Sequence, residues 1–374
     1  MFKKSRKLLL IVNVDYFLIS HRLDIALGAL KEGYEVHLAA KNTGRMNEIR
    51  KLGIHTHDIN LERSSTKIRS LFATFNSIKK VINKVDPSIL HFISIKPIIL
   101  GGILIHFIRK DPLIVASVSG LGQIYIASGC IASIKKLITN ILYSIALFHK
   151  NIIVIFQNKS DLNLLCSSTL LQQSKTILVH GSGVDLNKFK FSPIPKGKPI
   201  ILFYGRLIIS KGVLDFVEAA KVLKEKARFV ICGEIDFESK DHIQNELLDS
   251  WIESGLIEYL GFSNSIEKIV KKSSIVVLPS YREGLPKSLC EAAACGRPVI
   301  TSNVPGCRDA IIPNKTGFLM ELRNKDELVK KIKILINNPK VMEEMSINSR
   351  KLAENKFDKN KIVKEHLNIY NQSN

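Results

Sequence analysis

The sequence contains no long apolar run. Its longest candidate, 98–108, falls well short of the ~20 apolar residues that a membrane-spanning helix requires. The N-terminus begins with basic residues, but the apolar run that follows stops at Asn13 and Asp15 without a cleavage site. This run therefore predicts a first strand rather than a signal peptide, and we expect no transmembrane segment.

Cysteine is scarce as well, and the six cysteines show no Cys-x-x-Cys pair and no metal-like spacing. Most of them lie in apolar runs, which predicts buried, reduced thiols of a cytosolic protein. Glycine is absent from 13–20, directly after the first predicted strand. A nucleotide-binding oxidoreductase would need a Gly-x-Gly-x-x-Gly turn there, so the sequence argues against that class.

Acidic residues are outnumbered: 34 of them face 55 lysines and arginines, which leaves a net charge of +21. The excess is concentrated in residues 1–190, where 26 basic residues oppose 11 acidic ones. A basic first half indicates an anionic partner, such as a membrane surface, a phosphorylated acceptor or nucleic acid. Nucleic acid is disfavoured, because no recognised motif accompanies the charge. A lysine-rich surface that serves solubility is the simpler alternative.

What the sequence does contain is a regular alternation of apolar runs and amphipathic segments, the pattern of parallel α/β sheets. Its 374 residues, 45% of them hydrophobic, suit two such domains with a cleft between them. Predicted strands cover 7–14, 35–40, 55–59, 88–93, 113–118, 152–157, 176–180, 200–204, 229–232, 257–260, 275–278 and 298–302. Predicted helices cover 20–30 with Ser20 as N-cap, 66–85, 96–108, 131–148, 212–224 and most of 325–370, and a linker covers 191–199.

The stretch 279–297 predicts a tight loop and a helix after the strand 275–278. Pro286 suits the first turn of this helix, and Gly296 is placed to end it. Two carboxylates belong to the stretch, Glu283 in the loop and Glu291 inside the helix. A helix N-terminus at the end of a strand is a ready anion site, and a nucleotide diphosphate is the natural ligand for it.

Arg206 and Lys211 offer the positive charge that a diphosphate needs. They are five residues apart across a predicted strand–helix turn, so both can point at one pyrophosphate, the arginine as a fork and the lysine as a point charge. The sequence has no Asp-x-Asp to hold a metal in their place. In the alternative interpretation, both cations are merely exposed to solvent.

Four segments of the sequence resemble one known family. Glu283-Gly284-Leu285-Pro286, with Glu291, resembles the Glu-x7-Glu signature of the retaining family 4 glycosyltransferases, which have the GT-B fold. The other three segments follow the family's order: 181–189, 204–212 and 305–319. The resemblance implies an α/β protein with two doubly wound, Rossmann-like domains facing a central cleft. We expect an acceptor-binding domain at 1–186, a nucleotide-sugar domain at 187–350, and a C-terminal helix at 351–374 that returns to the first domain.

The resemblance also implies a role for each matched residue. Arg206 and Lys211 would hold the donor diphosphate without a metal cofactor, Glu291 would bind the ribose hydroxyls, and Glu283 would contact the transferred sugar; Glu283, Arg206 and Lys211 are the catalytic candidates. The UDP-sugar is then a substrate and not a cofactor. The other donor-binding residues expected are Gly233, Glu234, Phe262, Gly284, Leu285 and Pro286.

The first half departs from the family pattern in two places. The loop 13–21 lacks the usual glycine pair, and the loop 119–122 lacks the histidine that many members place near the reacting sugar. No catalytic histidine is therefore carried over, and Ser119 or backbone amides of its loop are the substitutes. The acceptor-side candidates are Asp15, His21, Lys96, Ser119 and Gly120. For His21, a structural role is the alternative.

This variant resembles a bacterial branch that builds O-antigen, capsule or protein-linked glycans on undecaprenyl diphosphate, including α-1,3-N-acetylgalactosaminyltransferases. It implies transfer of a sugar, an N-acetylhexosamine, from a UDP-sugar to a polyprenyl-diphosphate-linked glycan at the inner face of the cell membrane. The basic regions 63–84 and 131–148 suit an anionic leaflet, or else are ordinary amphipathic helices. The alternative function is a nucleotide-sugar epimerase of the same fold, which needs no acceptor.

Overall fold

The computed structural model describes residues 6–62, 67–108, 111–125 and 129–373. The chain divides into two compact units, one formed by 1–182 with 360–374 and the other by 183–359. The second unit thus begins at Gly183, where 187 was predicted, and the chain rejoins the first unit at Asn360, where 351 was predicted.

The first unit is built on a seven-stranded parallel sheet with the order β3-β2-β1-β4-β5-β6-β7. Side chains of β1 alternate between two cores, with Leu8 and Leu10 in one and Leu9 and Ile11 in the other. A strand segment that is buried on both faces must be apolar, and the buried residues 8–12 of β1 all are. The strands are β1 (Lys7–Val14), β2 (Glu35–Lys41), β3 (His55–Asp58), β4 (Ile89–Ile93), β5 (Leu113–Val118), β6 (Ile152–Phe156) and β7 (Thr176–Leu178).

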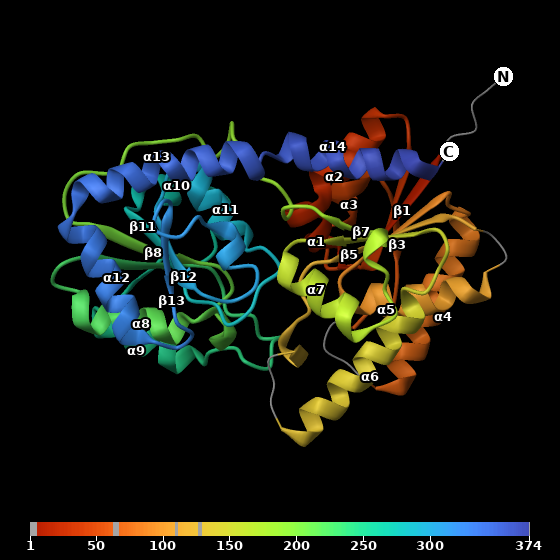
Figure 1. Cartoon of the computed structure of the whole chain (residues 1–374), viewed down its shortest axis with the longest axis horizontal. Helices are drawn as coiled ribbons and strands as arrows, with labels where there is room; N and C mark the ends of the chain where they lie inside the picture. Colours follow the sequence, from red (N-terminus) through yellow and green to blue (C-terminus); the bar gives the residue numbers. More distant parts are fainter. Residues whose placement is uncertain (1–5, 63–66, 109–110, 126–128, 374) are drawn as a thin grey trace. The chain divides into compact units, whose positions relative to one another are not determined.

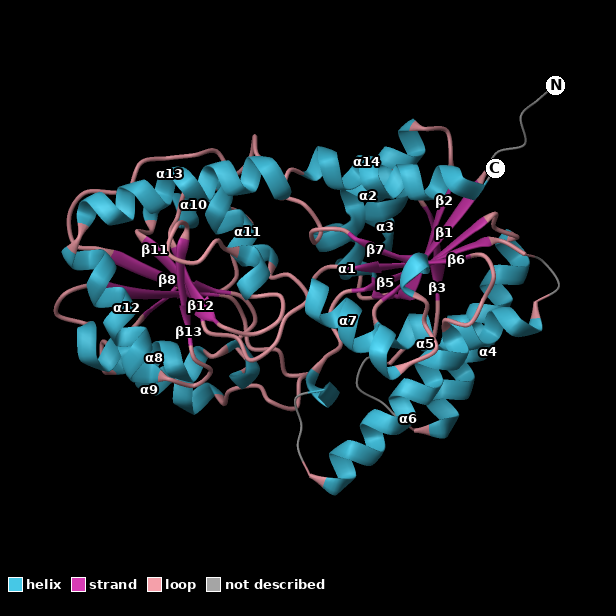
Figure 2. Ribbon diagram, viewed as in Figure 1, coloured by secondary structure: helices cyan, strands magenta, loops and turns pink. Residues whose placement is uncertain are grey.

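Helices cover both faces of this sheet (Figure 2). One layer consists of α2 (Leu23–Lys31), α3 (Met46–Lys51) and α14 (Lys359–Tyr370). The other consists of α4 (Ile68–Val85), α5 (Ile95–Leu104), α6 (Cys130–Ala146) and α7 (Lys159–Ser168). No helix in the described part of the chain combines the length and the apolar character that crossing a bilayer requires.

The second unit has a six-stranded parallel sheet with the order β10-β9-β8-β11-β12-β13. Its strands are β8 (Ile200–Tyr204), β9 (Arg228–Cys232), β10 (Glu258–Tyr259), β11 (Ile275–Leu278), β12 (Val299–Ser302) and β13 (Gly317–Met320). Its helices, labelled in Figure 1, are α8 (Val213–Leu223), α9 (Asn245–Glu253), α10 (Ile266–Lys272), α11 (Lys287–Ala294), α12 (Lys325–Asn337) and α13 (Pro339–Lys356). The strand order of each sheet reverses once, between β1 and β4 and between β8 and β11, so the predicted pair of doubly wound units is confirmed.

The segment 191–199 is not the predicted linker but a fixed part of the second unit. The guanidinium of Arg297, which is fully buried, donates hydrogen bonds to the carbonyls of Ser192 and Pro193. These hydrogen bonds from a buried arginine fix the backbone of the segment. The low periodicity that suggested a linker therefore reflects a fixed segment without helix or strand.

The start of the first helical segment also differs from the prediction. After β1 the chain forms the short helix α1 (Asp15–Phe17) and a π-helix, Leu18–Arg22, that continues directly into α2. Ser20 is therefore no N-cap, and its hydroxyl donates back to the carbonyl of Tyr16 at 3.0 Å. Neither α3 nor α7 was predicted from the sequence. Residue 66, the predicted start of another helix, lies outside the described residues.

Candidate functional site

The carboxyl ends of β8 and β11, neighbours at the switch point of the second sheet, carry the two predicted segments. After β8 come Arg206 and a 3₁₀ turn, Ile209–Lys211, that leads into α8. After β11 comes the loop 279–286, which leads into α11. Ligands of doubly wound sheets bind at such a point. The strand order therefore brings Lys211 and Glu283, which are 72 residues apart in the sequence, into contact.

Lys211 and Glu283 form an ion pair between these two segments. Lys211 Nζ donates to Oε1 of Glu283, and Ser280 Oγ donates to the same oxygen at 2.8 Å. The lysine and glutamate side chains are only 18% and 15% exposed. Because burial reduces screening by water and salt, this pair is a stronger electrostatic feature than an ordinary surface pair.

Two glycines with positive φ allow the loop 279–286 to lie close to its neighbours. At Gly212, with φ of 76°, a Cβ atom would come within 2.2 Å of the Pro279 carbonyl oxygen. At Gly306, with φ of 80°, it would come within 2.4 Å of the Glu283 carbonyl oxygen. Only glycine tolerates both the conformation and the close approach, so these two positions fix where Glu283 lies.

Arg206 has a partner that the sequence analysis missed. Its Nη1 lies 2.5 Å from Oδ2 of Asp236, and its side chain is 45% exposed. Asp236 follows β9, which pairs with β8. The only signal in the sequence is an acidic residue shortly after a strand, which is too common to single out.

Glu291 lies on α11 and is 8% exposed. Among the described residues its carboxylate has two distant partners, the Tyr204 hydroxyl at 3.4 Å and Lys287 Nζ at 3.7 Å. Burial raises the pKa of Glu291, and the charges of Lys287 and Lys188 oppose this. The carboxylate therefore keeps the capacity to accept further hydrogen bonds.

The helix α11 begins at Lys287, so Pro286 is its N-cap residue and not part of its first turn. Its carbonyl accepts hydrogen bonds from the amides of Leu289 and Cys290 at 3.1 and 3.3 Å. Gly296, with φ of 74°, follows the C-cap, and it ends the helix as predicted. The N-terminus of α11 thus directly follows the loop that carries Glu283.

The predicted donor-binding residues Gly233, Glu234 and Phe262 follow β9 and β10 and border the same edge of the second sheet. The amide of Gly233 donates to the Gly261 carbonyl at 2.8 Å, and the carbonyl of Glu234 accepts from the Leu207 amide at 2.8 Å. The latter bond ties this turn to the segment that carries Arg206. The side chain of Phe262 is 49% exposed, so an apolar ring surface is open at this edge.

In the first unit, Asp15 has a structural use that its sequence position did not reveal. Its carboxylate accepts hydrogen bonds from the amides of Tyr16, Thr43 and Arg45 at 2.8–3.0 Å, and from the Thr43 hydroxyl. Burial acts to raise the pKa of Asp15, but the hydrogen bonds from Thr43, Arg45 and Tyr16 together hold this pKa below its ordinary value. The fully buried carboxylate fixes the loop after β2, so the predicted acceptor contact through it is not supported.

His21 is held within its own helical segment. Its Nδ1 lies 2.6 Å from Ser20 Oγ, and its ring stacks on Phe17 with centroids 4.6 Å apart. These contacts fit the structural alternative for this histidine.

The remaining acceptor-side candidates follow β4 and β5. Lys96, in the first turn of α5, donates to the carbonyl of Glu62, and burial lowers the pKa of the lysine. Ser119 and Gly120 directly follow β5. Ser119 Oγ accepts a hydrogen bond of 3.5 Å from Arg22, a buried residue that the sequence analysis passed over.

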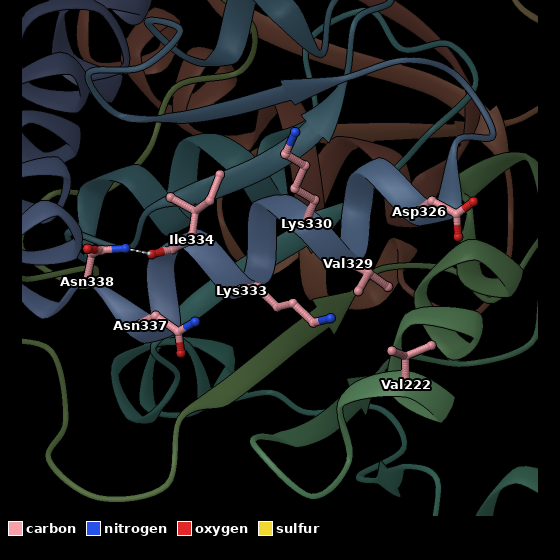
Figure 3. A pocket seen from close by; sticks show the side chains of 8 residues that line it. All are labelled: Val222, Asp326, Val329, Lys330, Lys333, Ile334, Asn337 and Asn338. Carbon is pink, nitrogen blue, oxygen red and sulfur yellow. Dashed lines mark hydrogen bonds between the residues drawn. The ribbon is translucent and has the colours of Figure 1, made fainter.

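A depression of about 530 Å³ lies elsewhere on the second unit, over α8 and α12 (Figure 3). It is lined by Val222, Asp326, Val329, Lys330, Lys333, Ile334, Asn337 and Asn338. None of the predicted site residues lines it, so it is distinct from the candidate site.

Comparisons with known proteins agree with the fold. The chain matches "Glycosyl transferase 4-like" over residues 7–158 and "Glycosyl transferases group 1" over residues 185–352. It is 30% identical over 352 residues to the N,N'-diacetylbacillosaminyl-diphospho-undecaprenol alpha-1,3-N-acetylgalactosaminyltransferase of Campylobacter jejuni, covering 90% of this chain and 91% of the relative.

One further relative is similar over part of the chain, and one solved structure is similar in fold. The chain is 31% identical over 223 residues, 55% of this chain and 57% of the relative, to the UDP-Gal:alpha-D-GlcNAc-diphosphoundecaprenol alpha-1,3-galactosyltransferase of Escherichia coli. A sucrose-phosphate synthase from Thermosynechococcus elongatus has the same fold, with a TM-score of 0.80 over 98% of both chains at 18% identity. The chain belongs to the group 1, family 4-like glycosyltransferases with the GT-B fold.

Proposed function

We propose that this glycosyltransferase moves an N-acetylhexosamine from a UDP-sugar to a glycan carried on undecaprenyl diphosphate, in O-antigen, capsule or protein-glycan synthesis. The Campylobacter jejuni relative bears a name that specifies such an acceptor and N-acetylgalactosamine, and the Escherichia coli relative bears one that specifies UDP-galactose. The observation that carries the proposal is the group of Arg206, Lys211, Glu283 and Glu291 on adjoining segments at the switch point of the second sheet.

In this proposal, Arg206 and Lys211 bind the donor diphosphate. Negative charge accumulates on the diphosphate as the glycosidic bond breaks, and fixed cations beside it stabilise that transition state. Lys211 already lies against Glu283, so a bound diphosphate would share the ammonium with this carboxylate. The two cations take the place of a metal ion, and turnover that persists in excess EDTA is the expected result.

Glu291 would bind the ribose. A vicinal diol offers two hydroxyl donors, and the buried carboxylate of Glu291 has partners only at 3.4 and 3.7 Å in the described part of the chain. Glu283 would accept a hydrogen bond from the transferred sugar or stabilise positive charge that develops on its ring. The donor and product would share one anomeric configuration, which the anomeric coupling constant in proton NMR spectra of the product tests.

The first unit would lie on the inner face of the cell membrane. The helix α6, yellow in Figure 1, extends outward from this unit. Along one face it exposes a row of apolar side chains: Ile131, Ile134, Leu137, Ile138, Ile141 and Ile145. The buried side chains of α6 are those of Tyr143 and Ala146, which lie near its C-terminal end. Lys135 and Lys136 add positive charge, so α6 suits insertion at an anionic lipid surface.

The test is a panel of UDP- and GDP-sugars offered with a membrane lipid extract, with the products identified by mass spectrometry. We expect one UDP-N-acetylhexosamine to yield a lipid-linked product heavier by one sugar. A parallel reaction without lipid tests for an epimerase: a changed nucleotide sugar in that reaction, and no lipid product, would contradict the proposal.

A further inference from the structure

Arg22 is a buried arginine at the carboxyl edge of the first sheet. It ends the π-helix after β1 and is 2% exposed. Its Nη1 donates to the His21 carbonyl at 3.0 Å and to Ser182 Oγ at 2.8 Å, and its Nη2 donates to Ser119 Oγ at 3.5 Å. Its Nε is buried and has no hydrogen-bond partner among the described residues.

The groups around Arg22 do not neutralise its charge. His91 lies between Ser117 Oγ at 2.6 Å and the Tyr370 hydroxyl at 2.7 Å, and burial holds the pKa of His91 well below its ordinary value. Burial, aided by the charge of Arg22, lowers the pKa of His366 to about 3. Both histidines are therefore neutral at physiological pH. Within the described residues no carboxylate contacts the guanidinium, although burial lowers the pKa of Arg22 only to about 10.

The buried arginine of the second unit, Arg297, has a purely structural role, and its contacts differ from those of Arg22. Arg297 donates from Nε, Nη1 and Nη2 to backbone carbonyls of Cys295, Ser273, Ser192 and Pro193, so its guanidinium is fully used within the fold. Among the described residues, Arg22 donates to one carbonyl and two hydroxyls, and its Nε has no acceptor. A buried charge with so few partners is costly to the fold, and this cost suggests a purpose beyond packing.

The two hydroxyls indicate what that purpose is. Each accepts a hydrogen bond from a cation, so its own hydrogen must point away from Arg22. In the described part of the chain, neither Ser119 nor Ser182 donates that hydrogen to a protein group. Both residues are half-buried and follow strands at the carboxyl edge of the sheet, so a ligand can reach them. The edge thus offers two hydroxyl donors backed by one positive charge, which suits an anion with several acceptor oxygens.

We propose that Arg22 is a positioning residue that directs the Ser119 and Ser182 hydroxyls to the phosphoryl oxygens of the acceptor's diphosphate. This inference rests on the proposed function for the identity of the ligand. The net positive charge of the first half of the chain would draw the same diphosphate to this unit.

The test uses the full chain saturated with UDP, which occupies the diphosphate site of the second unit, and titrates it with inorganic pyrophosphate. We expect Arg22→Met to weaken pyrophosphate binding at least 10-fold, about 1.4 kcal/mol, and to raise the KM for the lipid-linked acceptor by a similar factor. The affinity for UDP should change less than twofold. Arg22→Lys should keep part of the pyrophosphate affinity that Arg22→Met loses. The double variant Ser119→Ala with Ser182→Ala should lose most of the same affinity.

The control variant is Arg50→Met, which removes an exposed arginine of the same unit. Unchanged pyrophosphate binding in Arg22→Met, or an equal loss of binding in Arg50→Met, overturns the inference. So does a parallel loss of UDP binding and melting temperature, which would mark Arg22 as structural. If Arg22→Met weakens binding to phosphatidylglycerol vesicles and leaves pyrophosphate binding unaffected, the site binds a lipid headgroup and the acceptor assignment is rejected.

The two proposals fail in different ways. A wild-type protein that transfers sugar normally, with Arg22→Met equally active at all acceptor concentrations, overturns this inference and leaves the proposed function intact. A wild-type protein that yields no lipid-linked product with any donor overturns the proposed function, and the pyrophosphate titration still reports on Arg22.

Discussion

The two sheets of the chain treat positive charge differently at their carboxyl edges. In the second unit each cation of the site is paired with a carboxylate, Arg206 with Asp236 and Lys211 with Glu283. In the first unit, the hydrogen bonds that Arg22 makes to described residues go to hydroxyls and a carbonyl only. Paired cations can exchange one anionic partner for another, which suits the proposed nucleoside diphosphate, since it must bind and later leave. A cation without a carboxylate is a permanent source of positive potential, which suits an anion that must be captured from dilute solution or from a membrane.

The largest expected effect concerns the ion pair of Lys211 and Glu283. We predict that Lys211→Ala lowers turnover about 10²–10³-fold, because a cation is lost where charge develops in the transition state. Lys221→Ala is the control, since Lys221 is 51% exposed and pairs with Glu218 within α8. Initial rates at saturating substrates decide the matter, with circular dichroism to show that both variants are folded. Rates for Lys211→Ala within threefold of wild type would contradict the account.

The next prediction separates the two buried arginines by stability. Arg297→Met leaves the carbonyls of Cys295, Ser273, Ser192 and Pro193 without their donor, and should cost about 3–5 kcal/mol of unfolding free energy. Arg22→Met removes a poorly paired buried charge and should change that free energy by no more than about 1 kcal/mol. Urea titrations measure both free energies of unfolding. Similar losses in the two variants would contradict the view that Arg297 is structural and Arg22 is not.

A third prediction concerns the membrane contact that we propose for the first unit. Leu137→Glu should weaken binding to phosphatidylglycerol vesicles about 10-fold, because it places a negative charge in the apolar row of α6. Val222→Glu is a matched control, since Leu137 and Val222 are both 60% exposed and lie in different units. Sedimentation with vesicles at moderate salt measures the effect. Equal losses in the two variants would show that α6 is not the contact.

The smallest effect is a pH-dependent change at Glu291. Because burial raises the pKa of Glu291, ionisation of this group is unfavourable in the folded chain. Above that pKa the wild type carries the buried charge and Glu291→Gln does not, so the variant should melt about 2 °C higher at pH 8. The difference should shrink as the pH falls and Glu291 becomes protonated.

The same variant should bind UDP about 10-fold more weakly, because the amide replaces one acceptor oxygen with a donor. Differential scanning calorimetry and calorimetric titration measure the two effects. Glu246→Gln, at an exposed position of α9, should change neither. A Glu291→Gln variant that melts lower than wild type at pH 8 would show that the carboxylate is better paired than its two distant contacts indicate.

The sequence was sufficient for the parts of the site that lie within one strand–loop–helix segment. The alternation of apolar and amphipathic segments predicted the two doubly wound units, and the spacing of Arg206, Lys211, Glu283 and Glu291 placed all four after strands of one sheet. These features are local, because a strand, its turn glycine and the following helix are contiguous in the chain.

What the sequence could not show were contacts between distant segments. Asp236 reaches Arg206 only because β9 pairs with β8, and Ser182 reaches Arg22 across 160 residues. Asp15 was expected to face a ligand, but the loop after β2 uses its carboxylate. Arg22 itself lies in a polar run, where nothing in the periodicity indicates burial.

The most direct test of the account is a two-substrate kinetic comparison of Glu291→Gln and Arg22→Met. KM is measured for the UDP-sugar and for the lipid-linked acceptor with each variant. The account predicts a crossed result: Glu291→Gln raises the KM for the donor about 10-fold and leaves that for the acceptor unchanged, whereas Arg22→Met does the reverse. Two variants that raise the same KM, or an Arg22→Met that changes neither, would contradict the division of the two substrates between the two sheets.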